Sequence, residues 1–190
     1  NLGAGIGWNG DANDDTYVHI ENVIGSDLTS SGDLIYGNEA ENHIWGMAGN
    51  DQLEGMGGAD TIDGGSGADY VSYSRSDSGV NVNLKTGVNT GGDAEGDTLI
   101  SIENIHGSNY DDVLTGSDGG NTIYADYGDD LLYGGAGADI LYGEEGADTF
   151  VFGASDTFGY VDTIKDFDVA EGDKIDISDL LSNYDPLTEA

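Results

Sequence analysis

Residues able to bind a hard cation recur every nine positions in this chain. Residues 134–151 read GGAGADILYGEEGADTFV, which is two copies of the pattern glycine-glycine-x-glycine-x-aspartate-x-aliphatic-x. Seven more copies begin at residues 37, 46, 55, 64, 107, 116 and 125. Position six always carries a carboxylate or an amide, and position eight is always apolar. The position-six residues are Asn42, Asp51, Asp60, Asp69, Asp112, Asn121, Asp130, Asp139 and Asp148.

A carboxylate beside a glycine turn supplies the ligands that calcium prefers. Glycines at positions one and four allow a tight turn where φ is positive, and they leave backbone carbonyls free to face a ligand. The carboxylate at position six adds a charged oxygen, and calcium takes ~6–8 oxygen ligands. The sequence therefore predicts calcium sites at the turns. The predicted ligand residues, with two outlying acids, are Asp33, Asn42, Met47, Gly49, Asp51, Met56, Gly58, Asp60, Gly65, Gly67, Asp69, Asp112, Asn121, Asp126, Gly128, Asp130, Gly135, Gly137, Asp139, Glu144, Gly146, Asp148 and Asp166.

Short strands must hold these turns in place. The last three residues of each copy are expected to form a strand whose middle side chain, at position eight, points into a core. LTSSGDLIY (28–36) is a degenerate tenth copy, with Asp33 at position six and Ile35 at position eight. Its serines replace turn glycines, so Asp33 is the first outlying candidate ligand.

The composition points to cations as partners. The 190 residues include 38 acids and only 4 Lys or Arg, for a net charge of −34. Such a chain repels nucleic acid and anionic membranes, and without metal it should repel itself and stay expanded. It has no cysteine, so bound metal would have to take the place of disulfides. No apolar stretch is long enough to span a membrane.

The repeats resemble the hemolysin-type calcium-binding nonapeptide, or RTX repeat, because spacing, glycines, aspartate and aliphatic position all agree. The resemblance implies an all-β fold, a right-handed parallel β-roll with two calcium-binding blocks and two nonapeptides per coil. Residues 18 apart would then stack, with several Ca²⁺ ions between stacked turns. The implied carboxylate pairs are Asp51/Asp69, Asp112/Asp130 and Asp130/Asp148. Asn42/Asp60 and Asn121/Asp139 would be weaker, having one carboxylate each.

A larger repeat frames the two blocks. DDTYVHIENVIGS (14–26) matches GDTLISIENIHGS (96–108) at an offset of 82 residues. VNVNL (80–84) and LISIENI (99–105) alternate apolar and polar residues, as half-buried strands do. The acidic loops 10–15 and 90–97 either bind calcium or are solvated turns, and solvated turns are the favoured interpretation. We expect one continuous solenoid comprising lead-in plus first block (1–72), lead-in plus second block (73–151) and a closing segment (152–190).

The closing segment carries a second resemblance. FVF (150–152), DTIKDF (162–167) and GDKIDISDLL (172–181) are similar to the segments that end RTX blocks in serralysin-type proteases and large type I-secreted adhesins. A short helix is expected near 177–181. Asp166 lies 18 residues beyond Asp148, so it is the second outlying candidate ligand and would close the last site. The chain begins at Asn1, within the pattern and without methionine, so we expect it to be part of a longer protein.

These features predict a non-enzymatic module that folds on binding calcium in a secreted, extracellular or cell-surface adhesin, with the type I secretion machinery as a partner. One alternative is the RTX module of a secreted enzyme, such as a serralysin-like protease or an alginate epimerase or lyase. Another is a polysaccharide-binding module that uses tyrosines at position nine, namely Tyr36, Tyr124, Tyr133 and Tyr142. A disordered linker is expected only without calcium, because the apolar position is strictly periodic.

Overall fold

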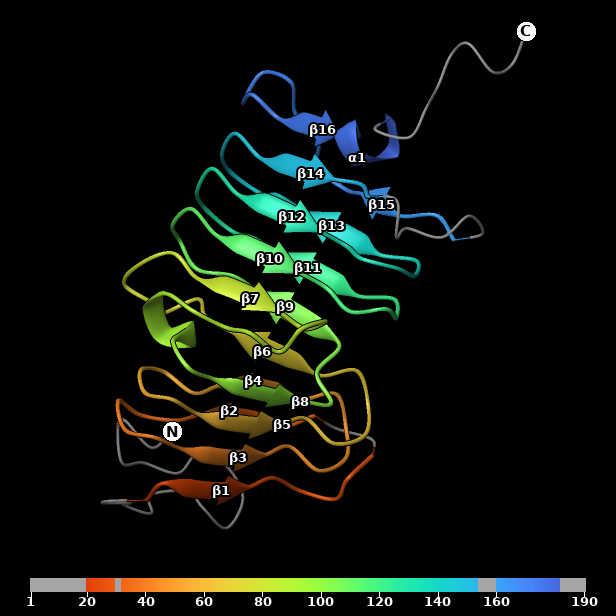
Figure 1. The fold of residues 1–190 in the computed structure, drawn as a ribbon. Helices are drawn as coiled ribbons and strands as arrows, with labels where there is room; N and C mark the ends of the chain where they lie inside the picture. Colours follow the sequence, from red (N-terminus) through yellow and green to blue (C-terminus); the bar gives the residue numbers. More distant parts are fainter. Residues whose placement is uncertain (1–19, 30–31, 154–159, 182–190) are drawn as a thin grey trace, which may run out of the picture.

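The chain winds into a solenoid of very short parallel strands (Figure 1). The computed structural model describes residues 20–29, 32–153 and 160–181. The first lead-in with its acidic loop 10–15, and the tail 182–190, lie outside these ranges. The strands are β1 (Asn22–Ile24), β2 (Leu34–Tyr36), β3 (His43–Trp45), β4 (Gln52–Glu54), β5 (Thr61–Asp63), β6 (Tyr70–Ser72), β7 (Asn81–Asn83), β8 (Thr98–Ile100), β9 (Asn104–His106), β10 (Val113–Thr115), β11 (Thr122–Tyr124), β12 (Leu131–Tyr133), β13 (Ile140–Tyr142), β14 (Thr149–Val151), β15 (Thr163–Ile164) and β16 (Lys174–Asp176).

The strands form two facing layers. One layer is a single seven-stranded sheet in the order β15-β13-β11-β9-β6-β4-β2. The other layer is divided into a four-stranded sheet, β1-β3-β5-β8, and a five-stranded sheet, β16-β14-β12-β10-β7. Successive strands alternate between the layers, and the pairings between these strands are all parallel. The predicted parallel β-roll is therefore confirmed.

The pairing register follows the nonapeptide within each block. Ile35 pairs with Leu53, and Leu132 pairs with Phe150, each 18 residues later. Two nonapeptides thus complete one coil, as the resemblance to the repeat implied. Each strand presents its middle residue inward, because side chains alternate between the two faces of a strand.

The core is one column of these position-eight side chains. Ile44, Leu53, Ile62, Val71, Leu114, Ile123, Leu132, Leu141 and Phe150 are all fully buried. They meet between the layers and form a single apolar cluster together with residues of the second lead-in, Tyr73, Val80, Val82 and Ile105. The column loses its cover at the carboxyl end, where Ile175 of β16 is half exposed.

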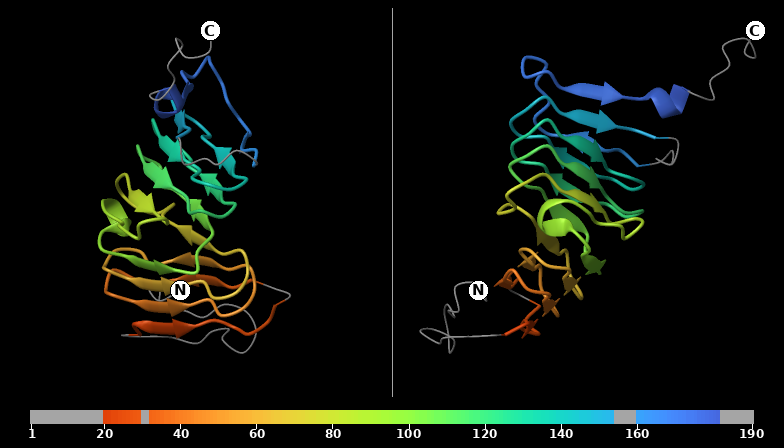
Figure 2. Two further views of the ribbon diagram at one scale, coloured as in Figure 1. Left: turned by 45° about the vertical axis from the view of Figure 1, so that its right-hand side comes forward. Right: turned by 60° about the vertical axis from the view of Figure 1, so that its left-hand side comes forward.

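The second lead-in interrupts the register between the two blocks. Val71 pairs with Ile105 and Val82 with Leu114, so about one extra coil is inserted in a different spacing. The divided layer changes sheets here, at β8 and β7, and Figure 2 shows the two halves of the solenoid meeting at this level. A 3₁₀ turn, η2 (Gly92–Ala94), covers the junction.

One strand prediction in this region was wrong and two other expectations are confirmed. LISIENI (99–105) is not a single alternating strand, because Ser101 adopts a φ of +51° and turns the chain from β8 in one layer to β9 in the other. VNVNL contains β7, with Val80 and Val82 buried as its alternation predicted. The expected short helix is α1 (Ser178–Leu181).

Candidate calcium sites

The position-six side chains form two ladders along the solenoid, one at the entrance to each layer. In each rung the backbone N–H of one position-six residue donates a hydrogen bond to the side-chain oxygen of the equivalent residue in the next coil. Asp51 donates to Asp69 at 2.8 Å, Asp112 to Asp130 at 2.7 Å and Asp130 to Asp148 at 3.0 Å. Asn42 donates to Asp60 and Asn121 to Asp139 in the same way. All five predicted pairs are therefore stacked neighbours.

The turns that precede these residues fall into two backbone classes. In six turns the residues at positions two and four both have positive φ, and we call these open turns. They contain Met47 and Gly49, Met56 and Gly58, Gly65 and Gly67, Asp126 and Gly128, Gly135 and Gly137, and Glu144 and Gly146. The turns that begin at Gly37, Gly107 and Gly116, all within the described residues, have no positive φ at either position, and we call these closed turns.

The role predicted for the glycine at position one was wrong. Positive φ occurs at positions two and four, and position two tolerates it in Met47, Met56, Asp126 and Glu144. Glycine is needed at position one for space. A Cβ on Gly55 would overlap the Asp60 carboxylate, and a Cβ on Gly46 would overlap both Oδ2 of Asp51 and the carbonyl oxygen of Gly64. Carboxylate and carbonyl oxygens therefore converge beside the position-one Cα.

Open turns leave one oxygen of the position-six carboxylate without a hydrogen bond. Oδ1 takes part in the ladder, whereas Oδ2 is buried and accepts no hydrogen bond from the described residues in Asp51, Asp60, Asp69, Asp130 and Asp148. These side chains are at least 98% buried. A buried acceptor without a partner costs about 1–3 kcal/mol, more when charged. Such an oxygen needs a cation or a proton, and Asp139 has the same open-turn backbone.

Closed turns fill the equivalent oxygen from within the chain. The N–H of Ser108 donates to Oδ2 of Asp112 at 2.6 Å, and its Oγ donates to Oδ1 at 2.7 Å. The N–H groups of Asn38 and Ser117 donate to the side-chain oxygens of Asn42 and Asn121. In each closed turn the position-two side chain also accepts a hydrogen bond from the N–H two residues later. These turns are local Asx and Ser turns that need no metal.

Burial raises the pKa of the open-turn carboxyls. Desolvation is the largest cause in each, opposed by the hydrogen bond from the ladder and reinforced by neighbouring acids. The pKa rises to about 7 in Asp60, about 8 in Asp130 and about 6 in Asp148. The pKa of Asp69 is raised for the same reason. The metal-free fold thus holds a column of carboxyls that resist ionising, and a nearby divalent cation would reverse this penalty.

Three ladder positions were missed by the sequence analysis. Asp97 accepts from Asp60 N–H at 2.8 Å, Asp162 from Asp139 at 2.9 Å and Asp173 from Asp148 at 3.0 Å. Each precedes a strand whose second residue is apolar, as in the nonapeptide, but the preceding turn lacks the glycine pattern. The interpretation of 90–97 as a solvated turn was wrong for Asp97, which is buried.

The two outlying candidates lie in different settings. Asp33 accepts from Ser26 N–H at 2.6 Å, and its own N–H donates to Asp51, so it begins a ladder as expected of a degenerate repeat. Asp166 does not follow Asp148 in the ladder, since Asp173 holds that place. Its carboxylate instead caps the last open turn, accepting from Gly143 and Glu144 N–H.

Acidic side chains at position two add charge outside the second block. Asp126 and Glu144 lie one coil apart and, with Tyr127 and Glu145, line a small surface pocket. Asp126 Oδ2 is 2.8 Å from Nε2 of His106, and this contact raises the pKa of His106. Within the described ranges no three His, Asp or Glu side chains are arranged to hold a metal by themselves. A bound calcium would therefore combine one or two carboxylates with backbone carbonyls, which matches the oxygen set at the open turns.

Comparison with known proteins agrees with this donor set. Residues 30–71, 101–131, 115–150 and 124–157 match the family of the RTX calcium-binding nonapeptide repeat in four copies. The matched segments together span about half of the chain and contain all six open turns. A comparison with curated proteins found no match.

Proposed function

The chain belongs to the family of RTX calcium-binding nonapeptide repeats, and we propose that it is the calcium-dependent folding module of a type I-secreted bacterial surface adhesin. Calcium binding and a secreted parent protein follow from the family. The adhesin, the export route and the absence of catalysis are our proposal. The observation that carries it is the set of buried carboxylate oxygens in the open turns that accept no hydrogen bond from the described residues.

Folding and binding are coupled in such a site. The position-two and position-four carbonyls and the position-six carboxylate come together only when two coils stack, so the site does not exist in the unfolded chain. When bound, calcium supplies the positive charge that the buried carboxylates lack. In the cytosol, where free calcium is low, the net charge of −34 keeps the chain expanded and able to thread an export channel. Outside, where calcium is near millimolar, even sites of ~10⁻⁴–10⁻³ M are filled.

The closing segment supports the adhesin over a secreted enzyme. The residues similar to adhesin segments, GDKIDISDLL (172–181), form β16 and α1 and complete the final coil. Among the described residues, no helix is long and apolar enough to cross a membrane. The test is the sequence of the parent protein upstream of Asn1. Tandem sandwich domains there would agree with an adhesin, and a protease or epimerase domain would overturn that part of the proposal.

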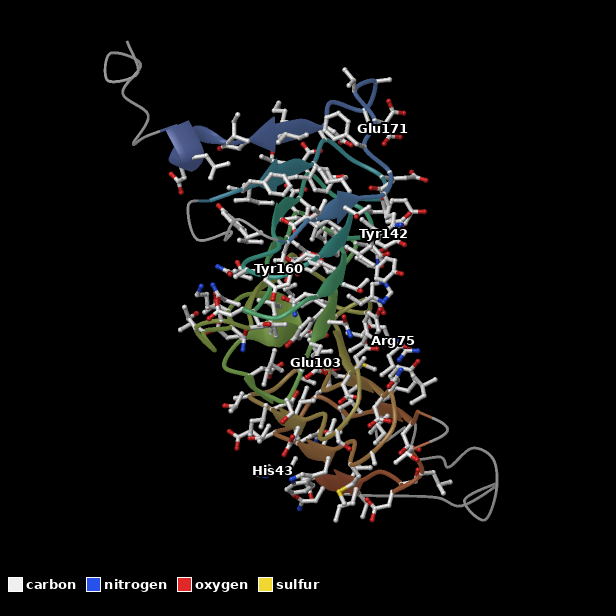
Figure 3. All side chains as sticks on the ribbon, turned by 90° about the vertical axis from the view of Figure 1, so that its right-hand side faces the viewer. His43, Arg75, Glu103, Tyr142, Tyr160 and Glu171 are labelled. Carbon is white, nitrogen blue, oxygen red and sulfur yellow. The ribbon has the colours of Figure 1, made fainter. Side chains whose placement is uncertain are left out.

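Sugar binding is a second candidate, supported by the outer face of the seven-stranded sheet. Tyr124 and Tyr142 stack with ring centroids 4.3 Å apart, and a shallow groove beside them is lined by Gln52, Tyr70, His106 and Tyr124. Figure 3 shows Tyr142 and Arg75 on the same side of the solenoid. Tyr133 lies in the other layer, so Tyr133→Ala is a matched control for Tyr124→Ala. Glycan binding by the calcium-loaded chain that is lost only in Tyr124→Ala would support this candidate.

A further inference from the structure

The open turns are not spread evenly along the solenoid. They form two groups, a first stack (46–72) and a second stack (125–151). Asp51, Asp60 and Asp69 lie in the first stack, and Asp130 and Asp148 lie in the second with the open turn of Asp139 between them. Between the stacks lies the central segment, residues 73–124, all of which the structure describes. It contains no buried side-chain nitrogen or oxygen that lacks a hydrogen bond.

Tyr73 closes the ladder at the start of the central segment. Its side chain is 1% exposed, and its hydroxyl donates a 2.9 Å hydrogen bond to Oδ2 of Asp97. Oδ1 of Asp97 meanwhile accepts from the N–H of Asp60, as in every other rung. The tyrosine hydroxyl therefore satisfies the oxygen that an open turn leaves without a hydrogen bond. One coil earlier in this ladder, Oδ2 of Asp60 has no such donor among the described residues.

The other rungs of the central segment are closed in comparable ways. Asp112 and Asn121 are satisfied by Ser108 and Ser117 in their closed turns. Val80 stands at a position-six place with no carboxylate, and its N–H donates to Asp112. The buried amide of Asn89 donates to the carbonyl of Asp97 and accepts from Asn83 N–H. The polar groups that in the stacks await a cation are here bonded to the chain itself.

Charge and packing separate the central segment from the stacks as well. It holds eight acids and both Arg75 and Lys85, a net charge of −6, whereas the rest of the chain carries −28. Arg75 lies 3.9 Å above the Tyr36 ring and pairs with Glu54, so it fastens the segment to the first stack. Lys85 pairs with Asp118 inside the segment. The buried side chains of Tyr73, Val80, Val82 and Ile105 give it an apolar core.

We propose that the calcium requirement of this protein is confined to the first and second stacks, and that the central segment is held by its own hydrogen bonds. It stays ordered at calcium concentrations at which both stacks have opened, and it gives each returning stack a coil to pair with. This inference rests on the proposed calcium-dependent folding. A segment of this size is marginal by itself, because small units bury a small share of their surface, so it does not oppose threading.

Hydrogen–deuterium exchange of the full chain, measured from chelator to millimolar calcium, tests the inference. The expected result is protection of 73–124 throughout, with protection of 46–72 and 125–151 appearing only as calcium is added. If calcium changed exchange nowhere, the proposed function itself would fail. If all three regions gained protection at the same calcium concentration, calcium-dependent folding would stand and the confinement to two stacks would be overturned.

Two variants sharpen the test. Tyr73→Phe leaves Oδ2 of Asp97 without its donor and should lower protection of the central segment in chelator roughly tenfold, the change expected for a buried acceptor without a partner. Tyr110→Phe, a half-exposed tyrosine in the same segment, is the control and should change nothing. Equal exchange in the two variants would overturn the role assigned to Tyr73.

Discussion

The backbone N–H of Asp51 donates a 2.8 Å hydrogen bond to Oδ1 of Asp69 in the next coil, while Oδ2 of Asp69 remains buried without a hydrogen bond from the described residues. One half of the carboxylate therefore builds the solenoid, and the other half faces the glycine turn where carbonyl oxygens converge. The same side chain links folding to cation binding. This division of labour explains why position six is acidic or amide in every copy of the repeat.

Neutralising an open-turn carboxylate should weaken calcium binding, whereas the same change in a closed turn should not. Asp130→Asn keeps the Oδ1 acceptor but removes the charge from a buried ligand, so titration calorimetry should show lower affinity or one site fewer. Asp112→Asn, one coil earlier in the same ladder, is the matched control because Ser108 already occupies its oxygens. Equal losses in the two variants would contradict the assignment of ligands by turn class.

Without calcium, acid should favour the fold. The folded-state pKa values of Asp60, Asp130 and Asp148 are about 7, 8 and 6, above the ordinary value of 3.8 that applies to the unfolded chain. The folded chain therefore binds more protons than the unfolded chain. This contribution to stability is complete below pH ~4 and is lost as pH rises through ~6–8.

Thermal unfolding in chelator checks this sign. The midpoint should be higher at pH 5 than at pH 8, because protons then satisfy the buried carboxyls. With calcium present the order should reverse, since protons compete with the cation for the same oxygens. A chelated chain that becomes less stable on acidification between pH 8 and pH 5 would contradict the raised pKa values.

Position four should tolerate alanine in a closed turn and reject it in an open one. Gly137 has a φ of +131°, and a Cβ there would lie 2.7 Å from the backbone of Gly119. Gly137→Ala should cost about 1–3 kcal/mol in calcium, the usual cost of a strained backbone. Gly119→Ala, one coil earlier, should stay within about 0.5 kcal/mol, because the site is exposed and its φ is not positive. Denaturant unfolding in calcium measures both, and equal costs would contradict the two turn classes.

Truncating position eight should be costly inside the column and mild at its end. Leu132→Ala removes a fully buried side chain and should lower the free energy of unfolding by about 2–5 kcal/mol. Ile175→Ala acts at the half-exposed end of the column and should cost less than half as much. Denaturant unfolding in calcium compares the two variants, and a larger cost for Ile175→Ala would mean that the final coil is better covered than the described residues indicate.

Much of the fold was predictable because the repeat is strictly periodic. The spacing of Leu53 and Val71 gave the 18-residue coil, and the aspartates gave the ladder rungs. The junction was not predictable in the same way. Ser101 divides an apparently continuous strand, and Asp97 and Asp173 enter the ladder from loops without the glycine pattern, because backbone geometry and tertiary pairing place them there.

The two turn classes had a signal in the sequence that went unused. Position two is Asn or Ser in the closed turns, at Asn38, Ser108 and Ser117, and these side chains satisfy local backbone N–H groups. In the open turns position two is Gly, Met, Asp or Glu. The contact between Tyr73 and Asp97 had no signal of this kind, since it depends on a pairing 24 residues apart that only the assembled junction creates.

The most direct test is far-ultraviolet circular dichroism of the chain in excess EGTA and after calcium is restored. The account predicts loss of most β-structure in chelator, with only the contribution of residues 73–124 retained, and full recovery with calcium at ordinary salt. A chain that keeps its complete β-structure in EGTA near neutral pH would show that the buried carboxylates need no cation, and would contradict calcium-dependent folding.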